Sequence, residues 1–149
     1  MADDLTIRPA GIGDCAALTA LMLRSSAYGG RYRRIIENYP VTAAMVKGNE
    51  VWVAERNGDL VGFYRLDLAN ADLDLMFVDD SVRGEGIGCA IFRHMAEFAA
   101  KSGLDHVQIV AHPPAADFYR RMGSVDIGVS KAKSDDGWDR PILRLPIAQ

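Results

Sequence analysis

The stretch from Asp72 to Lys101 carries the residues whose types and spacing point most clearly to chemistry. An alternating apolar segment leads into Arg83-Gly-Glu-Gly-Ile-Gly88, and helical spacing follows on one face, at Ile87, Ile91, Met95 and Phe98. The first turn of a helix has N–H groups without partners inside the helix. Glycines just before it permit positive φ and let a ligand approach the backbone. The pattern predicts an anion site, for phosphate or pyrophosphate, with Arg83 as a side-chain contributor.

Two common phosphate-binding loops do not fit this stretch. The dinucleotide fingerprint G-x-G-x-x-G/A fails, because its last position falls on Cys89 or on Ile91, depending on the starting glycine. The sequence contains no G-x-x-x-x-G-K-[ST] loop. A plain glycine-rich connection between strand and helix explains one or two glycines, but explains three alternating ones behind an arginine less well. The stretch therefore matches neither a dinucleotide-binding site nor a P-loop nucleotide site, and its expected anion belongs to another class of ligand.

Length and composition predict an ordinary globular protein. The 149 residues fit a single domain over residues 1–149, with 25% charged and 49% hydrophobic residues. A net charge of −3 without a basic stripe speaks against nucleic acid as the main partner. Cys15 and Cys89 fit a reducing, cytoplasmic location, and the N-terminus lacks a secretory pattern. The apolar run from Cys15 to Leu23 is too short to span a bilayer, so no membrane partner is expected.

Apolar periodicity and turn residues place the elements that must position this stretch. A strand, a helix and a strand follow a three-strand meander, which predicts an α/β fold with a mixed sheet flanked by helices. The strand after the central helix is expected to run parallel to the one before it. We expect strands at 5–9, 50–56, 60–66, 72–78, 105–111, 125–129 and 142–147, the last closing the sheet. We expect helices after an Asp14 N-cap, around 35–36 and 43–46, and at 87–101 and 115–123, with a turn at 135–137.

Two motifs carry a resemblance to a known family. Arg83-x-x-Gly86-x-Gly88 closely resembles the acyl-CoA-binding motif Q/R-x-x-G-x-G/A of the GNAT superfamily of N-acetyltransferases. The segment Ala115-x-x-Phe-Tyr-x-x-x-Gly123 resembles the second half of the family signature, usually N-x-x-A-x-x-F-Y-x-x-x-G-F. This chain departs from that form at His112, where Asn is common, and at Ser124, where Phe is common. The resemblance covers residues 5–147, and its specific part lies between 72 and 123.

The resemblance implies the GNAT fold and acetyl-CoA as the acyl donor. The pyrophosphate is expected on the backbone amides of the glycine turn, and the pantetheine arm along the strand before it, where an amide could polarise the thioester carbonyl. His112 stands where an asparagine usually contacts the arm. The implied donor-binding set is Met76, Phe77, Val78, Arg83, Gly84, Glu85, Gly86, Ile87, Gly88, His112 and Tyr119.

Three residues are candidates for catalysis. Tyr119 matches the tyrosine that protonates the leaving thiolate in many family members, a task that suits the pKa of a phenol. The alternative to a catalytic role is that Tyr119 packs its ring on the sheet and exposes its hydroxyl to water. Asp72 and Asp74 alternate with leucines, so a regular strand points both carboxylates the same way. Asp72 matches an acidic residue that often takes the amine proton; alternatively, both are solvated carboxylates on an open sheet face, or attract a cationic amine.

The sequence thus predicts an N-acetyltransferase that moves an acetyl group from acetyl-CoA to a primary amine. Direct attack in a ternary complex is expected, because no nucleophilic Cys or Ser constellation is visible. Two rivals remain: a non-catalytic acyl-CoA-binding regulatory module, and an enzyme with a different phosphate ligand. No metal site is expected from the His and Cys spacing. The resemblance also implies a homodimer. The sequence does not identify the acceptor amine.

Overall fold

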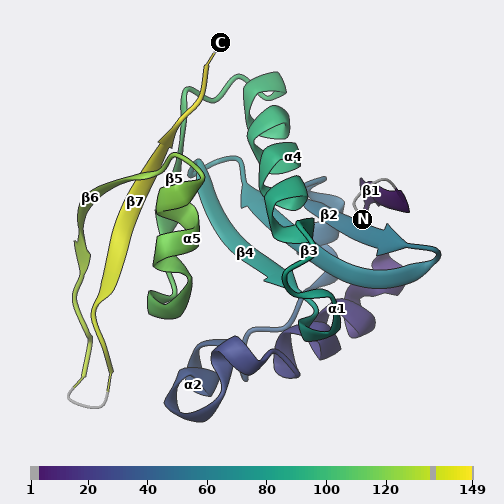
Figure 1. Ribbon diagram of the computed structural model, residues 1–149, viewed down its shortest axis with the longest axis horizontal. Coiled ribbons are helices and arrows are strands. Elements are labelled where there is room, and N and C mark those ends of the chain that lie inside the picture. The colour runs from purple at the N-terminus through teal and green to yellow at the C-terminus, as the bar shows by residue number, and fades with distance from the viewer. Residues whose placement is uncertain (1–3, 135–136, 149) are drawn as a thin grey trace. The chain divides into compact units, whose positions relative to one another are not determined.

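The computed structural model describes residues 4–134 and 137–148. Its elements follow the predicted order, so the strand and helix assignments are confirmed. Of the turn predicted at 135–137, residues 135 and 136 lie outside the described residues. Figure 1 shows the chain from β1, in purple, to β7, in yellow. The elements are β1 Leu5–Pro9, α1 Cys15–Leu23, α2 Arg33–Ile36, α3 Ala43–Lys47, β2 Val51–Arg56, β3 Asp59–Asp67, β4 Asp72–Val78, α4 Ile87–Lys101, β5 His106–Val110, α5 Ala116–Arg121, β6 Val125–Ser130 and β7 Arg140–Pro146.

The strands form one mixed sheet of seven, in the order β1-β2-β3-β4-β5-β7-β6. β4 pairs with β5 in parallel, Asp72 opposite Gln108, as a helical crossover between them predicts. The expectation that residues 142–147 close the sheet is wrong. β7 pairs antiparallel with both β5 and β6, so β6 is the edge strand and β7 lies inside the sheet. The reason is that β6 and β7 form a hairpin whose second strand is the one that reaches β5.

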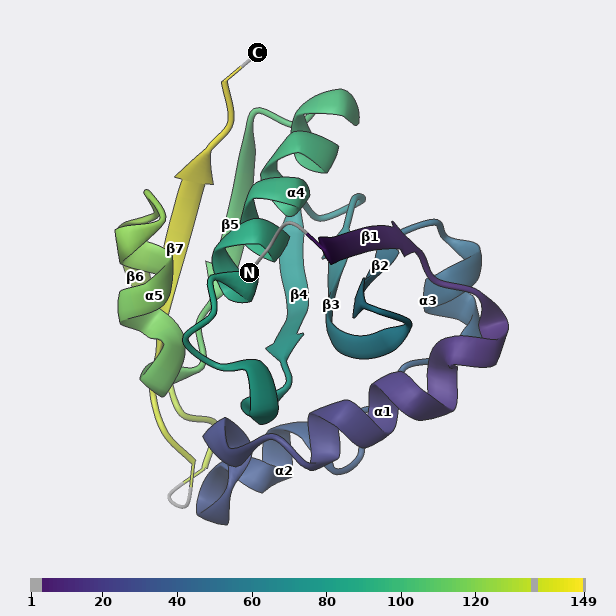
Figure 2. The same cartoon turned by 45° about the vertical axis from the view of Figure 1, so that its right-hand side comes forward.

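The described residues group into two compact units. The first holds the chain up to Leu66 together with Leu75–Met95, and the second holds Asp67–Asp74 with the residues from Ala96 onward. Figure 2 follows the first unit from β1 through α1 and α2, then back through α3 to β2. Its core joins the apolar side chains of α1 to α3 to one face of β2, β3 and β4: Leu18, Leu21, Met22, Ile36, Val41, Val46, Val51, Val53, Phe63, Leu75 and Phe77. The helix α1 therefore contributes Leu18, Leu21 and Met22 to this core.

The other face of β3 carries a glycine that lets α4 approach. A Cβ built at Gly62 would lie 2.7 Å from Cδ1 of Ile91 and 2.8 Å from the carbonyl oxygen of Phe77. Both distances are far shorter than any real carbon contact, so a side chain at position 62 would displace the helix or the neighbouring strand. The absence of a side chain at Gly62 therefore lets the N-terminal half of α4 pack against the sheet. The glycine turn that precedes α4 is positioned by the same contact.

The second unit packs α5 beside the strands at the far end of the sheet order (Figure 1). β5 and β7 contribute alternating buried side chains, and α5 adds two of its own: Val107, Ile109, Leu143, Leu145, Ala116 and Tyr119. None of the described helices combines the length and the apolar character needed to cross a bilayer.

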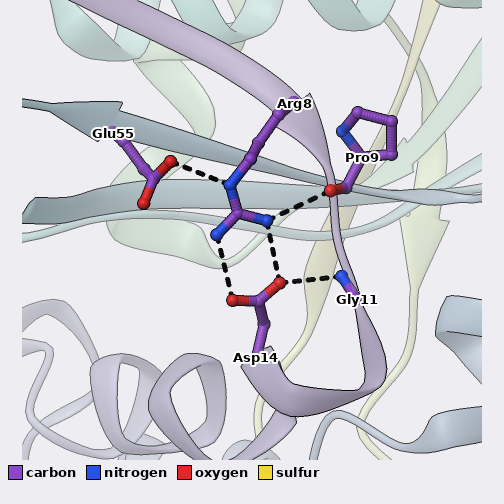
Figure 3. Close-up of polar contacts among 5 residues, drawn as sticks. All are labelled: Arg8, Pro9, Gly11, Asp14 and Glu55. Carbon is purple, nitrogen blue, oxygen red and sulfur yellow. Dashed lines mark hydrogen bonds and ion pairs between the residues drawn. The ribbon is translucent and has the colours of Figure 1, made fainter. Parts of the chain in front are cut away.

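Arg8 ties β1 to the start of α1 and to β2 (Figure 3). Its guanidinium donates to both carboxylate oxygens of Asp14, at 2.9 and 3.0 Å, and to Glu55 at 2.8 Å. Asp14 also accepts the N–H of Gly11 at 2.7 Å. Asp14 does occupy the N-cap position of α1, but its side chain makes no cap hydrogen bond. Its carboxylate is turned back to Arg8, because a short 3₁₀ turn at Ile12–Asp14 precedes the helix.

Replacing Arg8 with Gln should lower the thermal stability at neutral pH. Partly exposed ion pairs contribute about 0.2–1 kcal/mol each. The loss of two such pairs should cost roughly 0.4–2 kcal/mol, or a Tm lower by about 1–8 °C in a chain of this size. Melting curves of both proteins at neutral pH measure it. An unchanged Tm would show that the cluster adds nothing to stability.

The same cluster predicts a pH dependence. Hydrogen bonding to Arg8 lowers the pKa of Asp14 below its ordinary value of 3.8. An ionised Asp14 therefore stabilises the fold above the unfolded-state pKa, and this contribution is lost as the pH falls through the lower, folded-state pKa. The difference in Tm between wild type and Arg8→Gln should stay constant from neutral pH down to about 5 and shrink below 4. A difference that widens on acidification would contradict this assignment.

Candidate functional site

The glycine turn before α4 has the backbone conformation that the predicted anion site requires. Gly84 and Gly86 have φ of +84° and +81°. A Cβ at either position would meet nothing within 4 Å, so backbone conformation, rather than crowding, calls for glycine. The carbonyl of Gly86 accepts the N–H of Ala90 at 3.1 Å, which makes it the first acceptor of the helix. Ile87 is 1% exposed and anchors the first turn, whose N–H groups have no acceptor within the helix.

Arg83 is ordered beside the turn by neighbours on two segments. Its Nη2 donates to the Oδ1 of Asp80 at 2.6 Å and to the Oγ of Ser26 at 3.0 Å. The other oxygen of Asp80 accepts the N–H of Ser26 at 3.0 Å. The segment after α1 is therefore joined to the segment before α4 by two of these hydrogen bonds, both at Ser26. The guanidinium of Arg83, whose side chain is 62% exposed, is therefore held by Asp80 and Ser26.

Asp79 fixes the start of the connection between β4 and α4. Its N–H donates to the carbonyl of Val61 at 2.8 Å, and its carboxylate accepts the N–H of Ser81 at 3.0 Å. The same carboxylate pairs with the guanidinium of Arg24. Hydrogen bonding to Arg24, and then to the N–H of Ser81, lowers the pKa of Asp79. Asp79 is therefore ionised at neutral pH and anchors the connection.

Arg56 is joined to the glycine turn through Glu85. It lies at the end of β2, and its Nη1 forms an ion pair with Glu85 between the two positive-φ glycines. Its Nε donates to the Oδ1 of Asp4 at 3.1 Å. Sequence reasoning did not single out Arg56 or Arg24. No local pattern links either to its partner, because the pairs are separated by 29 and 55 residues.

β4 has the alternation expected of it. Leu73, Leu75 and Phe77 are buried, and the residues between them are half-buried, which puts Asp72 and Asp74 on one face of the strand. The ring of Phe77 lies in the core, 5.0 Å from that of Tyr28 and 5.7 Å from that of Phe63 between centroids. Phe77 can therefore offer a ligand only its backbone. The side chains of Met76 and Val78 are on the face opposite this core.

The second motif lies in the second unit. Tyr119 is on α5, is 8% exposed, and has the ring of Phe118 5.4 Å away in an edge-on arrangement. Its carbonyl accepts the N–H of Ser124 at 3.0 Å, which fixes the chain as it leaves the helix. His112 is 5% exposed, and its carbonyl accepts the N–H of Ala115 at 2.8 Å. Both positions are therefore well packed rather than on a solvated surface.

The predicted residues fall in both units. Met76, Phe77, Val78 and the stretch Arg83–Gly88 belong to the first, and Asp72, Asp74, His112 and Tyr119 belong to the second. Within residues 4–134 and 137–148, no group of three or more His, Cys, Asp or Glu side chains is placed to hold a metal ion.

Known proteins similar to this chain are acetyltransferases. The family model described as "Acetyltransferase (GNAT) domain" matches residues 31–138. An uncharacterised N-acetyltransferase of Methanocaldococcus jannaschii is 34% identical over 63% of this chain and 45% of its own length. The peptidyl-lysine N-acetyltransferase YjaB of Salmonella typhimurium is 30% identical over 81% of this chain and 77% of its own.

The folds agree as well. The crystal structure of a GCN5-related N-acetyltransferase from Rhodopseudomonas palustris matches with a TM-score of 0.77 at 17% identity, over 95% of this chain and 94% of that one. The chain spans less than half the length of two curated relatives, the M. jannaschii protein and a streptothricin acetyltransferase of Streptomyces lavendulae. The predicted GNAT fold is confirmed, and the chain belongs to the GNAT acetyltransferase family.

Proposed function

We propose that this protein is an N-acetyltransferase that transfers the acetyl group of acetyl-CoA to a primary amine. The observation that carries the proposal is the exposed turn at Gly84–Gly86, with two positive φ angles, which opens the 15-residue helix α4. Turns of this kind direct backbone N–H groups at one point, and the helix dipole adds partial positive charge there. A pyrophosphate suits such a site better than a neutral ligand.

The donor would be held by backbone more than by side chains. Amides from Gly84 to Gly88 bind the pyrophosphate, and Arg83 adds a cation beside it. The pantetheine arm follows the backbone of Met76, Phe77 and Val78, and His112 replaces the usual asparagine contact to it. The burial of the Phe77 ring supports a role for its backbone alone.

The chemistry requires a proton to leave the amine and another to reach the departing sulfur. Attack of the amine nitrogen on the thioester carbonyl forms the amide bond and breaks the C–S bond, releasing CoA thiolate. Tyr119 donates its phenolic proton to that thiolate, and Asp72 or Asp74 accepts the proton from the amine, directly or through water. No covalent enzyme intermediate is needed, so donor and acceptor meet in a ternary complex.

The acceptor is proposed only as a primary amine. Among the relatives, one is named for peptidyl-lysine and another for streptothricin, so related chains carry names that point to different acceptors. The proposal includes a single domain, a homodimer in the cytoplasm, and neither nucleic acid nor a membrane as partner. A non-catalytic acyl-CoA-binding module is the alternative, and it predicts binding without turnover.

Thermal stabilisation by acetyl-CoA, compared with ATP and NAD, tests the donor. A ligand present at 100 times its Kd stabilises the folded state by about 2.7 kcal/mol, so the melting temperature should rise clearly with acetyl-CoA alone. Release of free CoA thiol in the presence of a panel of amines and lysine peptides then tests transfer. Stabilisation without thiol release across the panel would favour the binding module. No stabilisation by acetyl-CoA would overturn the proposed donor site.

A further inference from the structure

Glu85 puts a negative charge inside the turn that is proposed to bind an anion. It lies between Gly84 and Gly86, and its side chain is 40% exposed. A carboxylate there can harm donor binding in two ways. It repels a pyrophosphate, and it can fold back onto the amides of its own turn as an internal anion. The chain therefore needs a device that keeps this side chain away.

Arg56 has the position and charge for that task. Its guanidinium is paired with Glu85 on one side and with Asp4 on the other. Its side chain is only 15% exposed, and it forms an ion pair with each of these carboxylates. Strand pairing also fixes the backbone of Arg56, which lies opposite Leu5 of β1 and opposite Asp59 of β3. The ion pair therefore directs Glu85 toward the end of β2.

We propose that Arg56 is a positioning residue for the acyl-CoA donor, which acts by holding and neutralising Glu85. The inference rests on the proposed function of the glycine turn. Arg56 does not need to touch the donor. Its effect on affinity passes through the carboxylate of Glu85, and this distinguishes it from Arg83, which is proposed to contact the donor itself.

A double-mutant cycle measured as the Kd of acetyl-CoA tests the proposal without an acceptor. Calorimetric titrations of wild type, Arg56→Met, Glu85→Gln and the double variant give four values. Methionine keeps most of the aliphatic stem of Arg56, and Arg56→Gln is the second neutral variant should the first not fold. Arg56→Met should weaken binding roughly 3- to 10-fold, as expected for one uncompensated charge near a bound anion. In the Glu85→Gln background the same change should alter Kd less than about twofold.

Three further measurements separate positioning from general destabilisation. The defect of Arg56→Met should shrink as salt rises, because charge repulsion is screened, and Arg56→Lys should restore most of the affinity. Arg8→Gln is the matched control, since Arg8 also bridges two carboxylates in the same unit, and neither Asp14 nor Glu55 belongs to the turn (Figure 3). It should lower Tm and leave the Kd of acetyl-CoA unchanged.

The outcomes separate the two proposals. If the wild type does not bind acetyl-CoA, the proposed function fails. If the wild type binds and Arg56→Met weakens binding equally in both backgrounds, Arg56 acts on the donor or the fold directly, and the inference is overturned. An Arg56→Met protein with wild-type affinity overturns it as well. If Arg56→Met weakens the binding of acetyl-CoA only when Glu85 is present, the inference is supported.

Discussion

Gly86→Glu should abolish measurable donor binding, with a Kd for acetyl-CoA at least about 100-fold weaker, equivalent to about 2.7 kcal/mol. Two effects combine at this position. With φ of +81°, any side chain strains the backbone, which moves the amides of the turn out of register. A glutamate also places a carboxylate where the pyrophosphate is proposed to sit. Steric overlap with neighbouring residues does not contribute to the effect, because a Cβ there meets nothing within 4 Å.

Gly103→Glu is the matched control for that change. Gly103 has φ of +84°, a Cβ there also meets nothing within 4 Å, and it follows the C-terminal end of α4. Each variant should lose roughly 1–2 kcal/mol from the strained backbone, which lowers Tm by about 2–8 °C. Only Gly86→Glu should lose the thermal shift and the calorimetric signal with acetyl-CoA. If Gly86→Glu binds acetyl-CoA as the wild type does, the donor lies elsewhere.

The elements of this fold are readable from the sequence because their signals are local. The helical spacing of Ile87, Ile91 and Met95 predicts α4, and all three are buried. The Asn57-Gly58 pair predicts the hairpin between β2 and β3, and both residues have positive φ. The glycine turn is likewise local, since its conformation is set by residues within one short segment.

Interactions between distant segments could not be predicted in this way. Nothing in the sequence around Arg56 distinguishes it from the other arginines, and its pairing with Glu85 exists only once β2 and the turn are brought together in the fold. Gly62 reads as an ordinary strand glycine, although the approach of Ile91 leaves no room for a side chain there. The place of β7 between β5 and β6 also depends on which strand of the β6–β7 hairpin pairs with β5. The alternation of apolar and polar residues does not determine that pairing.

Tyr119→Phe should lower kcat for acetyl transfer roughly 100-fold while the KM for acetyl-CoA changes by less than about threefold, because general acid catalysis contributes about 10²–10⁴ to the rate. The substitution removes only the hydroxyl. The buried ring and its edge-on contact with Phe118 remain, so the fold should be preserved. Steady-state rates with the best amine from the panel, measured by thiol release, give both constants.

Tyr64→Phe is the control that separates a catalytic hydroxyl from a structural one. The Tyr64 hydroxyl is 2.9 Å from Nδ1 of His94 and the side chain is fully buried, so its loss should cost about 1 kcal/mol of stability without lowering kcat. Tyr119→Phe should show the low kcat that Tyr64→Phe does not. If it keeps the wild-type kcat, Tyr119 is a packing residue of α5, and the leaving thiolate takes its proton from another donor. The two tyrosines are both buried and both lose one oxygen, so only a role in proton transfer makes their kinetic effects differ.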